Sequence, residues 1–114
     1  MASGNASTAN MKTSEQLKDD IVFDVVLRGN RLKFHTTWGL FSPRSIDDGS
    51  YLLIEHIDVK DGQDTLDLGC GYGPIGISLA KTSPHGSVHM VDTNFLAVDF
   101  ARKNADVNGL PNCK

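Results

Sequence analysis

Residues 65–76 join a short apolar segment that contains an acid to a turn rich in glycine. The turn carries Gly69, Gly71 and Gly73, which have no β-carbon, so the chain can bend sharply there and bring its amide groups close to a ligand. The first four residues have the pattern of a buried parallel strand, and Pro74 suits the first turn of a helix. A strand, a glycine turn and a helix in this order are typical of the first unit of a nucleotide-binding α/β fold.

The carboxylate of Asp67 favours a cationic ligand at this turn. The segment from Gly71 to Gly76 also satisfies the dinucleotide pattern G-x-G-x-x-G. A dinucleotide, however, must place its pyrophosphate beside the turn, where a carboxylate would repel it. S-adenosylmethionine has no phosphate and carries a sulfonium and an ammonium group, which a carboxylate attracts. The motif therefore indicates S-adenosylmethionine, with a nicotinamide dinucleotide as the alternative.

A second acid follows the next apolar segment at a spacing that suits a ribose. Residues 87–91 have the pattern of a strand, and Asp92 lies nineteen residues after Gly73. A carboxylate at such a distance accepts the ribose hydroxyls in dinucleotide folds. Asp92 also suits the N-terminus of a helix expected over residues 94–108. The sequence leaves both roles open, and they are compatible.

The composition is that of one small globular domain. The chain has 114 residues, of which 39% are hydrophobic and 22% charged, so a single core is expected. No apolar run approaches the roughly 18 residues needed to span a bilayer. Residues 1–16 lack the apolar segment of a secretory signal, and we expect them to be a disordered leader. Cys70 and Cys113 are expected to be reduced thiols in a cytoplasmic protein.

Basic residues gather between residues 25 and 46, although the net charge of the whole chain is −3. Arg28, Arg31, Lys33 and Arg44 lie there with no acid among them. A basic surface of this kind can contact phosphates, so RNA is the expected partner. The alternative is a hairpin whose charges only face water.

Local patterns predict the elements around the glycine turn. Residues 21–37 alternate around Gly29 and Asn30 and predict a β-hairpin. A helix capped by one of the two acids at positions 47 and 48 should follow, with Leu52, Leu53, and His56 or Ile57 toward the core. A further helix is expected after the glycine turn, before the one near the end of the chain.

Other chemistry is not indicated. His85 and His89 with Asp92 do not predict a metal site, because a turn followed by a strand does not bring such positions together. Cys70 is expected to fill the turn rather than to act as a nucleophile.

With these residues placed, the chain resembles the class I S-adenosylmethionine-dependent methyltransferases. It is most similar to the small-domain group that includes the rRNA small-subunit methyltransferase C family. Three stretches carry the likeness, namely Trp38–Ser42 followed by Asp48–Ser50, the motif at residues 66–73, and the segment from Asp92 to Gly109. Together they lie within about residues 21–110.

The resemblance implies a Rossmann-like α/β fold preceded by a hairpin. Residues 17–46 would form the hairpin and connector, and residues 47–114 the amino-terminal half of the cofactor-binding domain. It implies transfer of a methyl group from S-adenosylmethionine to a nucleobase nitrogen, with guanine N2 of ribosomal RNA favoured. Phe41 and Ser42 would border the pocket. The residues that it assigns to the cofactor are Asp67, Gly69, Cys70, Gly71, Tyr72, Gly73, Asp92, Thr93 and Asn94.

The chain departs from the family at the catalytic signature. That signature is Asn-Pro-Pro followed by an aromatic residue, and no proline here follows an asparagine. We therefore assign no catalytic residue. The family also adds a strand beside the first one, so residues 65–69 should form an exposed apolar edge that a second copy or a companion chain covers. We expect a fragment of a longer enzyme, with a non-catalytic cofactor- or RNA-binding fragment or split subunit as the alternative.

Overall fold

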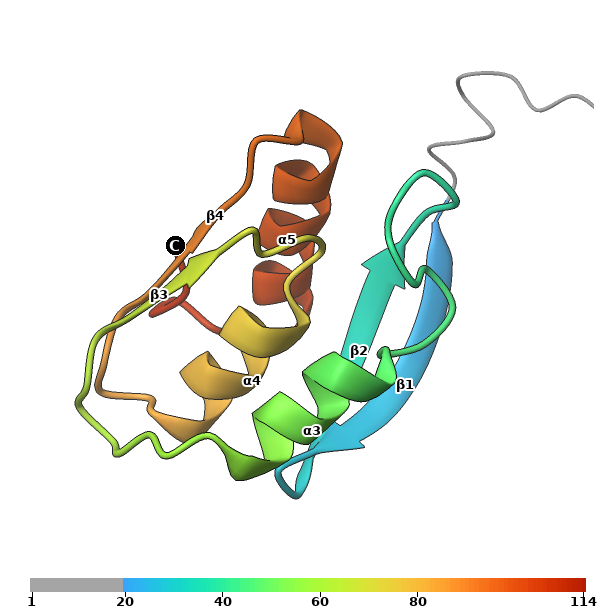
Figure 1. Ribbon diagram of the computed structural model, residues 1–114. Coiled ribbons are helices and arrows are strands. Elements are labelled where there is room, and N and C mark those ends of the chain that lie inside the picture. Colours follow the sequence, from blue (N-terminus) through green and yellow to red (C-terminus); the bar gives the residue numbers. More distant parts are fainter. Residues whose placement is uncertain (1–19) are drawn as a thin grey trace, which may run out of the picture.

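The structure, a computed structural model, describes residues 20–114, so the expected leader at residues 1–16 lies outside the described residues. Helices α4 and α5 lie between a parallel strand pair and an antiparallel hairpin (Figure 1). This arrangement confirms the predicted α/β fold with a hairpin before it. The elements in chain order are β1 (Ile21–Leu27), β2 (Asn30–Thr36), α3 (Asp48–His56), β3 (Thr65–Leu68), α4 (Pro74–Thr82), β4 (Val88–Val91) and α5 (Phe95–Val107).

The hairpin turns at Arg28 and Gly29, one residue earlier than the pair Gly29 and Asn30 suggested. Strands β1 and β2 pair from Ile21 opposite Thr36 to Leu27 opposite Asn30. Both turn residues have positive φ angles, 51° and 79°, as a two-residue turn requires when it follows the twist of the strands. Glycine reaches this conformation easily, whereas Arg28 reaches it at a cost.

Arg28 joins the hairpin turn to the end of α3. Its guanidinium donates hydrogen bonds to the carbonyl oxygens of Ile54 at 3.0 Å and Ile57 at 2.6 Å. Its backbone N–H donates to the Glu55 carboxylate at 2.6 Å. These bonds satisfy carbonyl groups that a helix C-terminus leaves without partners. The Arg28 side chain therefore serves the fold, and its assignment to an RNA-binding surface is corrected.

Helix α3 turns a different face to the core than the sequence suggested. Asp47 caps the helix as predicted, because its carboxylate accepts a hydrogen bond from the Ser50 N–H at 3.1 Å. The buried residue is Ile54, whereas Leu52 and Leu53 are exposed, so their expected place in the core was wrong. The helix packs against the hairpin and α4, and these two contacts select the Ile54 side.

The hairpin and the α/β part share one core. Phe34 is fully buried, and the rings of Phe23, Phe34 and Tyr72 form a cluster with centroid distances of 5.7 to 6.2 Å. Leu32 from the hairpin and Ile77 from α4 belong to the same buried cluster. Burying a phenyl ring contributes about 2 kcal/mol, so this cluster fixes the hairpin firmly on the helices.

Two asparagines of α5 complete the outer edge of β2. Asn104 accepts a hydrogen bond from the His35 N–H at 2.7 Å and donates to the His35 carbonyl at 2.9 Å. Asn108 makes the same pair of bonds with Lys33, at 3.0 and 2.8 Å. Because the asparagines are four residues apart, their side chains lie on one side of the helix and bond to alternate residues of β2. They replace the hydrogen bonds that a neighbouring strand would make there.

The parallel pair has one free edge and one bare face. Strand β4 pairs with β3 and, on its other side, with residues 112–114, where the Lys114 N–H donates to the Val88 carbonyl at 2.7 Å. The three helices lie on one side of the pair (Figure 1). Leu66 and Leu68 are 62% and 73% exposed on the bare face, and among the described residues β3 pairs only with β4.

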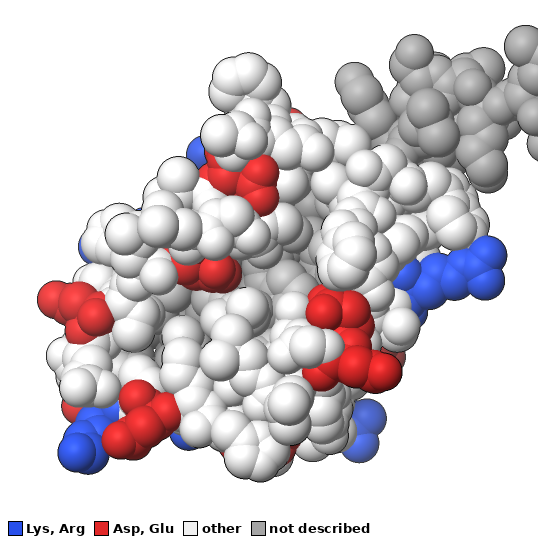
Figure 2. Space-filling view, viewed as in Figure 1, with Lys and Arg blue, Asp and Glu red and all other residues white. Residues whose placement is uncertain are grey.

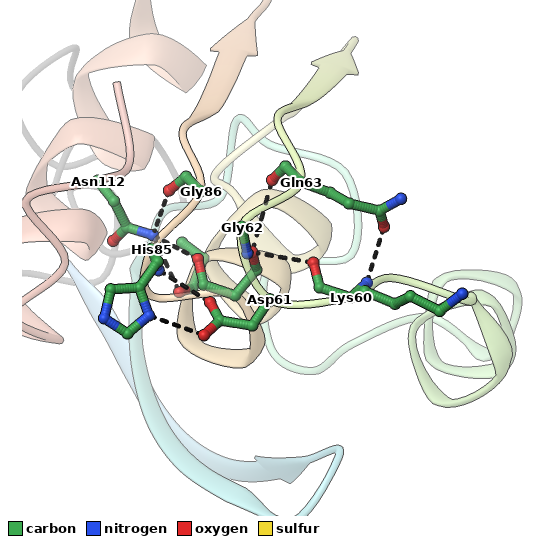
Figure 3. Close-up of polar contacts among 9 residues, drawn as sticks. Lys60, Asp61, Gly62, Gln63, His85, Gly86 and Asn112 are labelled. Carbon is green, nitrogen blue, oxygen red and sulfur yellow. Dashed lines mark hydrogen bonds and ion pairs between the residues drawn. The ribbon is translucent and has the colours of Figure 1, made fainter.

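A polar network holds the loops at the N-terminal ends of β3 and β4 (Figure 3). Asn112 donates to the Gly86 carbonyl at 3.0 Å, and the His85 ring nitrogen Nδ1 lies 2.7 Å from the Asp61 carboxylate. A β-carbon on Gly86 would come within 2.0 Å of the Gln63 carbonyl oxygen, so this crossing requires glycine. His85 is thus part of a structural contact. The described residues contain no group of three or more potential metal ligands.

Among residues 20–114, no helix is long and apolar enough to cross a bilayer.

Candidate functional site

A cavity of about 250 Å³ lies at the C-terminal ends of β3 and β4. One wall is the glycine turn between β3 and α4, and the other is the connector between β2 and α3. Figure 2 shows a hollow near the centre of this face with acidic side chains beside it, while lysines and arginines lie toward the rim. In parallel α/β sheets, ligands bind at this end of the strands. The cavity is therefore the candidate site.

The three glycines of the turn have different roles. Gly69 and Gly71 have φ angles of 69° and 59°, and a β-carbon on either would meet no atom within 4 Å. The space in front of them is open to a ligand. A β-carbon on Gly73, by contrast, would lie 3.0 Å from Ile77 and 3.7 Å from the backbone of Ala101. Gly73 therefore serves the close packing of α4 on α5.

Asp92 ties the end of β4 to the glycine turn. One carboxylate oxygen accepts a hydrogen bond from the Gly71 N–H at 2.9 Å, and the other accepts one from the Asn94 N–H at 2.9 Å. The hydrogen bonds from Asn94 and Gly71 hold the pKa of Asp92 below its ordinary value. An ionised carboxylate thus stands at the cavity wall near neutral pH.

Asp67 stands behind the turn rather than in the cavity. The residue is 8% exposed, and its carboxylate accepts a hydrogen bond from the Gly76 N–H at 3.0 Å in the first turn of α4. Burial, together with the negative charge of Asp92, raises the pKa of Asp67 in spite of this hydrogen bond. Asp67 therefore acts on the site through the shape of the turn and through its charge.

The nine residues assigned to the cofactor divide into two sets. Asp67, Gly73 and Thr93 do not line the cavity. Asn94 lines it and also caps α5, because its side-chain oxygen accepts hydrogen bonds from the N–H groups of Leu96 and Ala97. The six that line the cavity are Gly69, Cys70, Gly71, Tyr72, Asp92 and Asn94.

Neither Cys70 nor Tyr72 is suited to act as a nucleophile at neutral pH. Burial, with the nearby charges of Asp67 and Asp92, raises the pKa of Cys70 to about 12, so its thiol stays protonated at neutral pH. The ring of Tyr72 packs in the aromatic cluster of the hairpin, and burial raises the pKa of its hydroxyl. Both residues shape the turn, as expected for Cys70.

The connector contributes cavity residues that the sequence analysis did not assign. Tyr72 donates hydrogen bonds to the carbonyl oxygens of Ser42 at 3.1 Å and Ser45 at 3.3 Å, which hold the connector beside the turn. Phe41 lines the cavity as expected, whereas Ser42 does not. Asp47 also lines it, and no motif distinguishes its carboxylate from an ordinary helix cap.

Comparison with known proteins identifies the family of the chain. Residues 31–114 match the methyltransferase small domain family, and the chain belongs to that family. It is 42% identical over 89 residues to YbxB, an uncharacterised protein of Bacillus subtilis, covering 77% of this chain and 44% of that protein. It is 38% identical over 79 residues to the ribosomal RNA small subunit methyltransferase C of Hahella chejuensis, covering 69% of this chain and 23% of the relative.

A solved structure agrees with this assignment. The 16S rRNA N2 methyltransferase (RsmC) of T. thermophilus, in complex with AdoMet and guanosine, superposes with a TM-score of 0.76 at 28% identity. The match covers 83% of this chain and 26% of that one. The chain thus spans less than half the length of the relatives it matches, and the resemblance drawn from the glycine motif is confirmed.

The two acids should have opposite effects on stability. The pKa of Asp67 is higher in the folded chain than in the unfolded chain. As pH rises through these two pKa values, ionisation of Asp67 therefore lowers the free energy of unfolding. Asp67→Asn should therefore raise the free energy of unfolding at pH 7, and this gain should vanish in acid.

The pKa of Asp92 is lower in the folded chain than in the unfolded chain, so its contribution to stability is present above the unfolded pKa and is lost in acid. Asp92→Asn should lower the free energy of unfolding by about 1 kcal/mol at pH 7.

Urea denaturation over a pH series measures both effects, with Asp106→Asn as the control because Asp106 is exposed and far from the turn in sequence. A loss of stability in Asp67→Asn that persists at every pH would contradict this account of the buried carboxylate.

Proposed function

We propose that this chain supplies the cofactor-binding part of an S-adenosylmethionine-dependent methyltransferase. The acceptor we favour is a nucleobase nitrogen of ribosomal RNA, guanine N2 above all. The observation that carries the proposal is the cavity between an open glycine turn and the carboxylate of Asp92, at the ligand-binding end of a parallel sheet. The AdoMet and guanosine bound by the T. thermophilus relative support the same choice of ligand and acceptor.

The charge of the cavity supports S-adenosylmethionine over a dinucleotide. Asp47 and Asp92 line it, and among the described residues no lysine or arginine does. Two unit charges 5 Å apart interact by about 3 kcal/mol at an effective dielectric constant of about 20. A diphosphate would meet that energy as repulsion, whereas the sulfonium and ammonium groups would meet it as attraction. We therefore assign the ribose hydroxyls to Asp92 and the methionine portion to the open side of Gly69 and Gly71.

The chemistry would rest on positioning. A sulfonium methyl is already reactive toward a nitrogen that approaches in line with the breaking bond, so the protein needs to orient the two and exclude water. Cys70 stays protonated and offers no nucleophile. No catalytic residue is assigned to this chain, and the groups that would hold the reacting nitrogen are expected in the part of the relatives that it does not match.

RNA is the proposed partner of the basic residues of the hairpin and the connector. Arg31 is exposed, and Arg44 lies with its guanidinium 4.6 Å from the centre of the Trp38 ring. Lys33 forms an exposed ion pair with Asp24 at 3.1 Å, a contact that water screens and that phosphate could replace. Three of the four basic residues first assigned to RNA thus stay available, and Arg28 does not.

A second candidate is a cofactor- or RNA-binding subunit that does not catalyse by itself. For a split subunit of this kind, we propose that a second copy or a companion chain covers the free edge of β3. A groove beside β3 is lined by Leu53, Ile57, Leu66, Leu68 and Leu79. Parallel sheets are normally covered on both faces, so we expect this groove to be covered as well.

Cofactor affinity tests the proposed function. Removing the charge of Asp92 takes away one attraction and the acceptor for the ribose hydroxyls, so Asp92→Asn should weaken S-adenosylmethionine binding by about tenfold or more. Asp106→Asn should leave it unchanged. Isothermal titration calorimetry of the folded variants measures these affinities. An Asp92→Asn variant that binds NAD tightly and S-adenosylmethionine as well as the wild type would overturn the cofactor assignment.

Association of the chain tests the proposed partner at the sheet edge. Leu68→Asp places a charge in the groove and should abolish self-association of the purified chain at micromolar concentrations. Leu52→Asp is the matched control, because Leu52 is also exposed, at 63%, but lies outside the groove. Light scattering coupled to size-exclusion chromatography measures the mass. A wild-type chain that is strictly monomeric, or a Leu68→Asp variant that still associates, would contradict a second copy at this edge.

A further inference from the structure

Phe41 combines exposure with a place in the cavity wall. The residue is 80% exposed, yet it lines the cavity together with the glycine turn. Its neighbour Leu40 is buried in the core and is 7% exposed, so the chain at this point is anchored on one side and open on the other. A phenyl ring left in water forfeits the stabilisation of burial, and a single exposed aromatic residue is common on protein surfaces, so it is the place of Phe41 in the cavity wall that points to a ligand contact.

The loop that carries Phe41 is held in place. Ser42 has a φ angle of 48°, a conformation that costs free energy for a residue with a β-carbon. Three hydrogen bonds keep it there, two from the Tyr72 hydroxyl to the Ser42 and Ser45 carbonyl groups and one from the Ser42 hydroxyl to the Ser45 carbonyl at 2.7 Å. A costly backbone conformation that neighbouring groups enforce is typical of functional sites. The ring is therefore presented by a fixed loop.

The loop that carries Phe41 has side chains that suit a nucleobase. Trp38 and Arg44 belong to this loop but do not line the cavity, and the Arg44 guanidinium lies 4.6 Å from the centre of the Trp38 ring. Flat aromatic rings beside an arginine bind unstacked bases, because the ring contacts the π-face of the base and the cation contacts the phosphate. An apolar protein segment would gain little from the arginine. A base must also leave its stack to reach a methyl donor in a cavity.

We propose that Phe41 is the stacking platform for the acceptor base as it enters the cavity. The inference rests on the proposed function, in which that base receives the methyl group, and it adds a substrate-contacting residue from the connector. The face of the base would lie against the Phe41 ring, which leaves its edge free to turn toward the cofactor. Arg44 would then contact the backbone of the flanking nucleotide.

The test uses a short single-stranded RNA with 2-aminopurine at its centre, whose fluorescence is quenched when the base stacks. In the presence of saturating S-adenosylmethionine, the wild-type chain should quench the probe. Phe41→Ala should remove the quenching and weaken RNA binding on the order of tenfold. Phe41→Tyr keeps the ring and should keep both. Phe95→Ala is the matched control, because Phe95 is 86% exposed but does not line the cavity.

Two further measurements separate this inference from the proposed function. Calorimetry should give Phe41→Ala a smaller loss of S-adenosylmethionine affinity than of RNA affinity. Arg31→Ala should weaken RNA binding in a salt-dependent way and leave the quenching of the bound probe unchanged. If the wild type binds S-adenosylmethionine but the probe is not quenched, or is quenched equally by Phe41→Ala, the inference is overturned and the proposed function stands. If the wild type binds no S-adenosylmethionine, both fail.

Discussion

The hydrogen bond from the Gly71 N–H to the Asp92 carboxylate is the contact on which the site depends. It joins the turn that follows β3 to the residue that ends β4, at 2.9 Å. Without it, the amide of Gly71 and the carboxylate would both need other partners, and only the backbone bonds from Gly69 and Cys70 to the Val91 carbonyl would still join the turn to β4. Together with the hydrogen bond from Asn94, this bond lowers the pKa of Asp92 and so favours its negative charge at the cavity wall.

The hairpin also helps to hold the glycine turn in position, although it precedes the α/β part in sequence. Asn104, fully buried, donates to the carbonyl groups of both His35 in β2 and Tyr72 in the glycine turn. Tyr72 in turn holds the connector through its hydroxyl. A buried asparagine with every polar group paired is stable only in one arrangement, because an unpaired group there is costly. The hairpin, the connector and the turn therefore hold one another in position.

The strand, turn and helix around Gly69 could be predicted from the sequence because glycine, proline and apolar patterns are local signals. The same holds for α5, which was predicted over residues 94–108 and spans Phe95–Val107. It failed where long-range contacts decide the outcome. Leu52 and Leu53 have the pattern of core residues, but the core side of α3 is chosen by its packing on the hairpin and α4.

Charge was the other feature that sequence could not resolve. Arg28 looks like any basic residue of a hairpin, and only the approach of the α3 C-terminus gives it carbonyl partners. Asp67 was expected beside the ligand, but the first turn of α4 takes up its carboxylate. In both cases the role of the charged side chain depends on partners that only the folded chain brings close to it.

The central claim is that the open glycine turn and Asp92 bind S-adenosylmethionine. Nuclear magnetic resonance of the 15N-labelled chain measures this at the residues concerned, because the amides of Gly69, Gly71 and Asn94 lie on the cavity wall. Titration with S-adenosylmethionine should shift these three signals in a saturable way, while Gly29 and Gly62, outside the cavity, should not move. Shifts caused by NAD alone, or no shift of Gly71 with S-adenosylmethionine, would contradict the account.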